Sequence, residues 1–287
     1  MTDRSILVTG ASTGIGEACA VEFDHLGWHV FAGVRRDEDG KRLEAKSSSR
    51  LRPVPLDVTD PATIDAAADE ITANVGDNGL TALVNNAGVA VGGPVEYIAI
   101  DEWRRQFEVN VFGQVAVTKG MLPLIRRSAA GGRIVFIGSI GGRMASPFIA
   151  PYSASKHAIE AIAESMRHEL FGSGIRTVVV EPGAVRTPIW DKGKSSADEI
   201  EQSLPPEGLE RYAGAIVGLR KGMEFQARTG VDPAVVARVV VRAVTTSRPA
   251  ARYLVGRDAK VMGTLAGILP DSVRDVIMRT SMKIVAR

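Results

Sequence analysis

The chain has 287 residues and carries 35 Lys and Arg against 33 Asp and Glu, which leaves a formal net charge of only +2. This near balance argues against a nucleic-acid-binding protein, because such proteins present a surplus of positive charge to the phosphates. Hydrophobic residues make up 45% of the chain and charged residues 24%, a composition typical of folded globular proteins. The single cysteine, Cys19, excludes an internal disulfide and fits a protein of the reducing cytoplasm.

Short segments rich in β-branched residues alternate with longer segments of helical periodicity from the start of the chain. Seven of the short segments are predicted strands, and they cover residues 5–9, 29–34, 52–56, 82–84, 133–138, 176–180 and 253–255. Most of them are continuously hydrophobic, as expected where helices cover both faces of a parallel sheet. The sequence therefore predicts an α/β protein with a single doubly wound Rossmann-type domain, in which a mostly seven-stranded parallel sheet has helices on both faces.

Capping residues in the sequence predict where several of the connecting helices begin or end. Asp60 and Asp232 each precede a proline, so that an N-cap carboxylate is followed by proline at the first helical position. Asp101 is expected to begin another helix, and Gly27 is expected to end the first one.

One connection is far longer than the others. Residues 188–231 separate a predicted strand from the next regular helix, and they contain Trp190, Tyr212 and Phe225. Long insertions after the carboxyl end of a strand usually serve binding. We expect two short helices here, which form a lid over a pocket for a hydrophobic small molecule.

The end of the chain is basic. Residues 248–287 contain eight basic and three acidic residues, and a last helix would place on one side Val273, Val276, Ile277, Thr280 and Ile284. We favour packing of this helix on the body or on a neighbouring subunit, because its apolar side lacks Trp and Phe; the alternative is peripheral contact with a membrane. The Rossmann domain, with its lid, is predicted to span residues 1–256, and a helical extension is predicted to span residues 257–287.

A glycine-rich turn follows the first predicted strand. Residues 9–16 read Thr-Gly-Ala-Ser-Thr-Gly-Ile-Gly, between a strand and the start of a helix. Glycines permit positive φ angles and close approach of the backbone to a ligand, and the N–H groups at a helix N-terminus favour a pyrophosphate. The turn predicts a dinucleotide site, and the alternative is a glycine-rich turn without a ligand.

Further motifs follow this turn in order: Asn85-Asn86-Ala87-Gly88, Asn110, Ser139, Tyr152-Ser153-Ala154-Ser155-Lys156 and Pro182-Gly183. Their order and spacing, from about residue 5 to residue 256, resemble the classical short-chain dehydrogenase/reductase superfamily. Two phrases resemble most its retinol and hydroxysteroid dehydrogenase branch, namely Glu181-Pro182-Gly183 and Arg252-Tyr253-Leu254-Val255-Gly256. The resemblance implies an oxidoreductase that transfers a hydride between a nicotinamide cofactor and the alcohol, ketone or aldehyde group of a hydrophobic small molecule.

The resemblance also implies which residues contact the cofactor. The turn that would hold the pyrophosphate region comprises Gly10, Ser12, Thr13, Gly14, Ile15 and Gly16. Adenine would contact Asp57 and Val58, and the adenosine ribose would lie near Asn86, Ala87 and Gly88. The nicotinamide end would be held by Tyr152, Lys156, Pro182, Gly183, Val185 and Thr187.

The end of the second predicted strand distinguishes NADP(H) from NAD(H) in this fold. An acidic residue there binds both ribose hydroxyls and repels a 2′-phosphate, whereas this chain has Arg35 and Arg36 and no carboxylate before Asp37. Because a guanidinium binds phosphate through paired hydrogen bonds, we predict NADP(H), with Arg35 as the main contact. Thr13 stands where many NADP-specific relatives carry a second basic residue, which leaves NAD(H) as the alternative; both arginines would then be a solvated strand end.

Tyr152 and Lys156 lie four residues apart in a predicted helix and therefore share one face. A neighbouring ammonium and an oxidised nicotinamide favour the phenolate, which makes Tyr152 a credible general acid and base. The resemblance implies that Ser139 hydrogen-bonds the substrate oxygen and that Asn110 holds a water connecting Lys156 to solvent. A nucleotide-binding sensor or scaffold without turnover is the alternative from another class, and it predicts damage at these four positions, all of which are intact.

Two further expectations concern metals and partners. No metal site is predicted, because no ligand spacing is formed by His25, His29, His157 and His168. The resemblance implies a homodimer or homotetramer, in which helices at about residues 101–128 and 151–172 pair between subunits.

Overall fold

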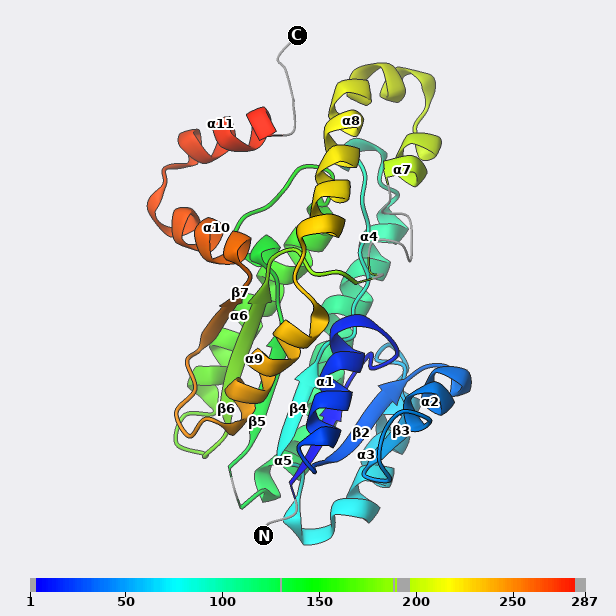
Figure 1. Cartoon of the computed structure of the whole chain (residues 1–287), viewed down its shortest axis with the longest axis vertical. Helices are drawn as coiled ribbons and strands as arrows, with labels where there is room; N and C mark the ends of the chain where they lie inside the picture. Colours follow the sequence, from blue (N-terminus) through cyan, green and yellow to red (C-terminus); the bar gives the residue numbers. More distant parts are fainter. Residues whose placement is uncertain (1–3, 130, 188, 190–196, 282–287) are drawn as a thin grey trace.

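A computed structural model describes residues 4–129, 131–187, 189 and 197–281. Within these residues, seven parallel strands form one sheet in the order β3-β2-β1-β4-β5-β6-β7 (Figure 1). The strands are β1 Ser5–Val8, β2 His29–Val34, β3 Leu51–Pro55, β4 Ala82–Asn85, β5 Arg133–Ile137, β6 Arg176–Pro182 and β7 Arg252–Val255. The predicted fold class is confirmed, and every predicted strand lies within two residues of its expected bounds.

The order of the strands reverses at β1. Ile6 of β1 lies between Val30 of β2 and Ala82 of β4, so successive strands are added first on one side of β1 and then on the other. In doubly wound sheets, ligands bind outside the carboxyl ends of the strands at such a reversal. The glycine turn leaves the sheet at this point.

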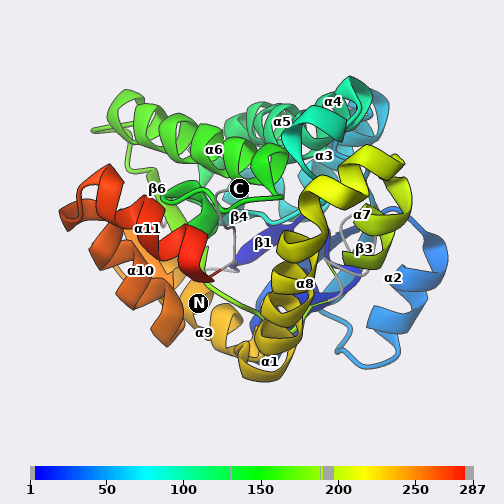
Figure 2. The same ribbon diagram turned by 90° about the horizontal axis from the view of Figure 1, so that it is seen from above.

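Helices cover both faces of the sheet, as Figure 2 shows from above. They are α1 Gly14–His25, α2 Asp37–Glu44, α3 Pro61–Val75, α4 Ile100–Phe107, α5 Gln114–Arg127, α6 Ala150–Glu169, α7 Ala197–Ser203, α8 Pro206–Thr229, α9 Pro233–Thr245, α10 Arg257–Ile268 and α11 Asp271–Ser281. On one face, α3, α5 and α6 form a hydrophobic core with the sheet, and on the other face α1 and α9 form a second core. These two layers bury the continuously hydrophobic strands from both sides.

The predicted helix ends are confirmed where a cap was identified. Asp60 accepts a hydrogen bond from the backbone N–H of Ala62 at 3.0 Å, and Asp232 accepts one from Ala234 at 2.9 Å. Each bond satisfies an N–H group that has no partner within its helix. Gly27 follows α1 with a φ of 77°. The helix expected from Asp101 begins one residue earlier, at the start of α4.

The predicted lid between β6 and α9 contains two helices, as expected, but they are not both short. α7 has seven residues, whereas α8 has 24 and projects beyond the sheet at the top of Figure 1. No proline interrupts α8 after Pro206, so the helix continues to Thr229. Trp190 and most of residues 188–196, which the prediction included, lie outside the described residues.

The lid helices share a third hydrophobic cluster with a loop beneath them. Its buried members are Phe148, Ala197, Ile200, Leu204, Ala215, Ile216 and Leu219. Among these buried members, Phe148 comes from the loop beneath the helices, and its ring meets the ring of Tyr212 edge-on at 5.7 Å between centroids. At the base of the lid, Val185 pairs with Val231 in a parallel bridge.

The predicted helical extension contains two helices. α10 packs on the body, where Ala259 is fully buried. In contrast, Val273, Val276 and Ile277 of α11 expose 42%, 58% and 42% of their surface. The expected packing on the body is therefore found for α10 and not for these side chains of α11, while Ile284 lies outside the described residues.

Candidate active site

The four predicted catalytic residues are brought together at the carboxyl ends of the central strands. Ser139 follows β5 and precedes the short helix η4 (Ile140–Gly142), while Tyr152 and Lys156 lie near the start of α6. Asn110 lies in a π-helical segment, η3 (Glu108–Gly113), between α4 and α5. All four are buried. Single π-helical turns inside longer helices are frequent at functional sites.

Hydrogen bonds fix the catalytic side chains relative to the end of β5. Tyr152 hydrogen-bonds Ser139, whose Oγ accepts a further bond from the N–H of Gly141 at 3.0 Å. Lys156 donates from Nζ to the carbonyl oxygen of Ile137 at 2.7 Å. The same Nζ lies 5.7 Å from the centre of the Tyr152 ring. The ammonium is thus held beside the phenol.

Burial sets the protonation of the pair. It raises the pKa of Tyr152 above its ordinary value, and the hydrogen bond with Ser139 opposes this effect without cancelling it. Burial also lowers the pKa of Lys156 to about 8, against the opposing charge of Glu160. At neutral pH the chain alone therefore has a protonated phenol and an ammonium ion. In the chain without a cofactor, burial raises the pKa of Tyr152 by more than the hydrogen bond with Ser139 lowers it. The chain's own groups therefore do not supply the expected preference for the phenolate.

The side chain of Asn110 fixes the loop that follows β4. Its Oδ1 accepts a hydrogen bond from the N–H of Val89 at 2.8 Å, and its Nδ2 donates to the carbonyl oxygen of Val89 at 3.0 Å. The same Nδ2 donates to Oγ of Ser155 in α6 at 3.2 Å. A Cβ added to Gly88 would lie 3.3 Å from Oδ1. Asn110 therefore joins the predicted ribose-binding loop to the catalytic helix.

The glycine turn has the close packing that a dinucleotide site requires. Gly10 and Gly14 both have a φ of 62°, which strains residues with side chains. A Cβ on Gly10 would lie 2.8 Å from Cα of Ala87, and one on Gly16 would overlap the carbonyl oxygen of Gly10. The turn is completed by three half-buried residues, Ser12, Thr13 and Ile15. Because α1 begins at Gly14, its first N–H groups face the turn, where they suit a pyrophosphate.

Asn86 supports the glycine turn as well as lying beside it. Its Nδ2 donates to the carbonyl oxygens of Thr9 and Gly10 at 2.9 and 3.1 Å. The backbone N–H groups of Asn86 and Ala87 each donate to Oγ1 of Thr9 at 3.0 Å. The sequence indicated the position of Asn86 near the ribose but not this supporting role.

The predicted adenine contacts lie in the loop after β3. Oδ1 of Asp57 accepts hydrogen bonds from the N–H and the hydroxyl of Thr59, at 3.0 and 2.8 Å. Val58 is buried, and a Cβ added to Gly113 would lie 2.7 Å from its Cγ2. This loop is held firmly where an adenine ring would meet it.

The predicted nicotinamide loop is tied to α10. A side chain on Gly183 would overlap the carboxylate of Asp258, which accepts a hydrogen bond from the N–H of Ala184 at 2.7 Å. Pro182 is buried at the end of β6. No local pattern identifies Asp258, which lies 74 positions from its partner. The first turn of the extension therefore contacts the predicted nicotinamide loop.

The same loop continues into the base of the lid. Val185 forms the bridge with Val231, and the N–H of Thr187 donates to the carbonyl oxygen of Val185 at 2.9 Å. Arg186 donates to the carbonyl oxygen of Gly230 at 2.9 Å. Val185 and Thr187, two of the predicted nicotinamide contacts, are thus half-buried residues at the base of the predicted lid.

The basic residues after β2 differ in their partners. Asp39 forms ion pairs with Arg36 at 3.0 Å and with Arg42 at 2.8 Å. Burial alone would raise the pKa of Asp39, but the hydrogen bonds from both guanidinium groups outweigh it and lower the pKa. Arg42 also donates to the carbonyl oxygen of Ser12 in the glycine turn. Arg35 is exposed, and no hydrogen bond or ion pair joins its side chain to another described residue.

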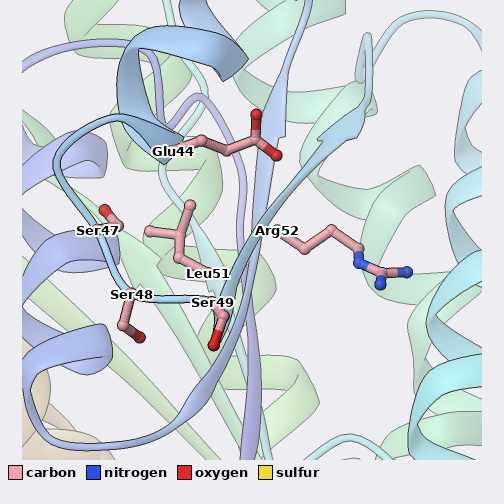
Figure 3. A pocket seen from close by; sticks show the side chains of 6 residues that line it. All are labelled: Glu44, Ser47, Ser48, Ser49, Leu51 and Arg52. Carbon is pink, nitrogen blue, oxygen red and sulfur yellow. The ribbon is translucent and has the colours of Figure 1, made fainter.

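A hollow of about 300 Å³ lies at the opposite end of the sheet, where β3 begins. Figure 3 shows its lining residues, which are Glu44, Ser47, Ser48, Ser49, Leu51 and Arg52. The side chain of Arg52 points away from the serine loop in this view. The hollow contains none of the predicted site residues, so the chemistry is assigned to the carboxyl edge of the sheet.

The described ranges contain neither a candidate metal site nor a candidate membrane-spanning helix. No group of three or more His, Cys, Asp or Glu side chains in them could hold a metal ion. None of their helices combines the length and apolar character needed to cross a membrane.

Comparison with known proteins assigns the family. The model of the short chain dehydrogenase family matches residues 4–198, which include all four predicted catalytic residues. An NADPH-dependent 3-dehydrocapnine reductase from Ornithobacterium rhinotracheale is 36% identical over 283 residues, which cover 98% of each chain. Human retinol dehydrogenase 5 is 34% identical over 95% of this chain and 87% of its own. Bovine 17-beta-hydroxysteroid dehydrogenase type 6 is 35% identical over 98% of this chain and 89% of its own.

A solved structure gives the same result. The crystal structure of a short-chain dehydrogenase from Streptomyces avermitilis superposes with a TM-score of 0.78 at 32% identity, over 97% of this chain and 96% of that one. The relatives include retinol and hydroxysteroid dehydrogenases, as the phrases in the sequence predicted. This chain belongs to the short-chain dehydrogenase/reductase family and is an NAD(P)-dependent oxidoreductase.

Proposed function

We propose that this chain is an NADP(H)-dependent alcohol dehydrogenase or carbonyl reductase for a hydrophobic small molecule. The observation that carries the proposal is the buried group of Ser139, Tyr152 and Lys156 at the carboxyl edge of the sheet. This group can protonate and stabilise an oxygen that becomes negatively charged, and the lid lies on the same side of the sheet.

In the reducing direction, Tyr152 donates its proton to the substrate oxygen. The protonated phenol found at neutral pH suits this step. The N–H of Gly141 occupies a lone pair on Ser139 and orients its hydroxyl, which can turn from the Tyr152 oxygen to stabilise the developing oxyanion. Lys156 stabilises the phenolate that remains and has further N–H donors for the nicotinamide ribose. The nicotinamide, when bound, supplies or accepts the hydride.

NADP(H) is favoured by the exposed guanidinium of Arg35 and by Arg42, which pairs with Asp39 through one nitrogen and reaches the glycine turn with another. Arg36 is held by Asp39, whereas Arg35 has no partner among the described side chains. Arg42 reaches the backbone of Ser12, close to the position where relatives carry a basic residue in the turn. Arg35 and Arg42 would therefore bind a 2′-phosphate from two sides.

A hydrophobic substrate is favoured by the cluster that joins the lid to the body. Phe148 lies in this cluster with a φ of 66°, a conformation that costs a residue with a side chain about 1–2 kcal/mol. Such strain persists where the surroundings require it, often at binding sites. The names of the relatives, which mention retinol and a 17-beta-hydroxysteroid, agree with an apolar substrate.

The substrate class is tested with a series of straight-chain ketones of increasing length. We expect kcat/KM with NADPH to rise about threefold to fourfold for each added methylene, because each buried methylene contributes about 0.8 kcal/mol. Ile216→Ala, which loosens the lid cluster, is expected to flatten this dependence. Ile268→Ala is the matched control, because Ile268 is 72% exposed on α10 and lies outside that cluster. A series in which kcat/KM does not depend on length would contradict a hydrophobic site.

The two alternatives predicted from the sequence have separate signatures. An NAD(H)-dependent enzyme would show the higher kcat/KM with NADH. A sensor or scaffold would bind a nucleotide without turning over any alcohol, ketone or aldehyde.

A homodimer or homotetramer, paired through α4–α5 and α6, is the assembly that we propose. Phe112 between α4 and α5 and Phe171 after α6 are 58% and 82% exposed, and pairing would bury such aromatic surface. Light scattering should give a dimer or tetramer for the wild type and a smaller species for Phe112→Asp. The control is Val276→Asp on α11, which should not change the mass. A monomeric wild type would contradict the pairing. If V276D dissociated the assembly and F112D did not, the interface would lie at α11 and not at α4–α5 and α6.

The cytoplasm is the location that we propose. It is supported by the lone Cys19, which is fully buried and forms no disulfide.

A further inference from the structure

A buried cluster of charged side chains lies behind the catalytic residues, and the proposed chemistry does not use it directly. Its core is the carboxylate pair Glu160 of α6 and Glu181 of β6, whose side chains are 11% and 0% exposed. Two arginines reach this pair, Arg143 after η4 and Arg252 at the start of β7. Buried charges are costly unless they are paired, so the cluster requires an explanation.

Ion pairs with good geometry hold the two carboxylates in place. Arg143 contacts Glu181 at 2.7 Å, and Arg252 contacts Glu160 at 2.8 Å. Arg252 also contacts Glu164, one turn further along α6, at 3.1 Å and approaches Glu181 at 3.6 Å. The cluster therefore connects four elements: α6, the segment after η4, and the strands β6 and β7.

The two carboxylates also face each other closely enough to share a proton. Burial raises the pKa of Glu181 to about 7 against the opposing effect of Arg143, and the nearby Glu160 adds to the rise. Oε1 of Glu160 is buried, and it accepts no hydrogen bond from an N–H group or from a Ser, Thr or Tyr hydroxyl of the described residues. A proton carried by Glu181 accounts for this unsatisfied oxygen.

Glu160 is directed at the same short stretch of backbone as Lys156. A Cβ added to Gly138 would lie 3.2 Å from Oε1 of Glu160. This oxygen therefore lies close to the backbone of Gly138, which is the residue between Ile137 and Ser139. The carbonyl oxygen of Ile137 accepts the hydrogen bond from Lys156. Residues four apart in a helix lie on one face, so Glu160 and Lys156 share the side of α6 that faces the end of β5.

We propose that Glu160 is a positioning residue for Lys156: its carboxylate keeps the buried amine charged, while the surrounding ion pairs hold that carboxylate beside the end of β5. The charged groups around Glu160 are Arg252 from β7 and Glu181 from β6, which Arg143 contacts from the segment after η4. The neutral amides of Asn110 and Gln106, from η3 and α4, reach Ser155 of α6. Glu160 is the acidic neighbour whose charge acts on Lys156.

The consequence for catalysis is a wider working range at high pH. This step rests on the proposed function, in which ketone reduction requires Lys156 as the ammonium ion. The pKa of Lys156 is about 8, and without the negative charge of Glu160 it falls further. Activity is lost as the pH rises through this value, so removal of the charge should move the alkaline limit of kcat to lower pH.

The test compares Glu160→Gln with Glu164→Gln. Both variants remove one carboxylate that contacts Arg252, but Glu164 is 49% exposed and lies a further turn from Lys156. For E160Q we expect the alkaline limit of ketone reduction to fall by about one pH unit. For E164Q we expect the profile of the wild type, and for Glu160→Asp we expect the limit to be largely restored. A purely structural role would lower the melting temperature without moving the limit.

A second measurement does not depend on turnover. Titration of the Lys156 side chain by heteronuclear NMR, in the protein without added cofactor and assigned by its loss in Lys156→Met, reports its pKa directly. We expect a lower pKa in E160Q than in the wild type and no change in E164Q; Glu160→Ala removes the same charge if E160Q is insoluble. Equal titration curves for E160Q and the wild type, or equal shifts for E160Q and E164Q, would overturn the inference. An NMR shift in a protein that reduces no ketone would instead support the role of Glu160 and count against the proposed function.

Discussion

Tyr152→Phe is expected to lower kcat for ketone reduction by about a thousandfold, which is the usual contribution of a positioned proton donor. The phenyl ring fills the same buried space next to Ser139, so folding and cofactor affinity should change little. Steady-state kinetics with NADPH measures the loss in kcat, and titration calorimetry with the same cofactor measures the affinity.

Tyr253→Phe is the matched control for this variant. It also removes one phenolic hydroxyl, but that hydroxyl accepts a hydrogen bond from the N–H of Ala250, before β7 and away from the catalytic residues. Its kcat should equal that of the wild type. If Y152F retained a substantial part of the activity, the proton would have to come from another group.

Replacing Arg35 with Gln is expected to lower kcat/KM for NADPH by about 10- to 100-fold, the value of a charge-assisted hydrogen bond to a phosphate. The value for NADH should be nearly unchanged, because NADH has no 2′-phosphate. Arg42→Gln is expected to act in the same direction, since Arg42 reaches the glycine turn from α2.

Arg36→Gln provides a sharp control, because it is the adjacent residue with the same side chain. It is paired with the buried Asp39 at 3.0 Å and, unlike Arg42, it donates no hydrogen bond to the glycine turn. Loss of Arg36 should therefore affect NADPH and NADH equally and weakly. A wild type that prefers NADH, or an R36Q variant as impaired with NADPH as R35Q, would contradict the assignment of Arg35 and Arg42.

Local signals made much of the fold predictable. Each strand is a short segment that contains at least one β-branched residue, and the caps at Asp60 and Asp232 depend only on residues two positions away. The glycine turn was identifiable because Gly10 and Gly16 occupy positions where a Cβ would overlap the neighbouring backbone. Such constraints are visible in the sequence because they determine residue type at fixed spacing.

The parts that could not be predicted depend on contacts between distant positions. Arg42 meets Ser12 across 30 positions, and Arg143 meets Glu181 across 38. Nothing in the neighbouring sequence distinguishes these arginines from solvated ones. The π-helical turn around Asn110 was also invisible, because its one-residue shift barely alters the periodicity of a long helical segment.

Hydride transfer by this protein is measured most directly with NADPH that carries deuterium at both positions of nicotinamide C4. The wild type is incubated with a long-chain ketone, and the alcohol product is analysed by mass spectrometry. We expect one deuterium on the carbinol carbon of the product, and no labelled alcohol with Y152F. Binding of NADPH by the wild type without labelled alcohol from any ketone or aldehyde in the series would contradict the proposed function.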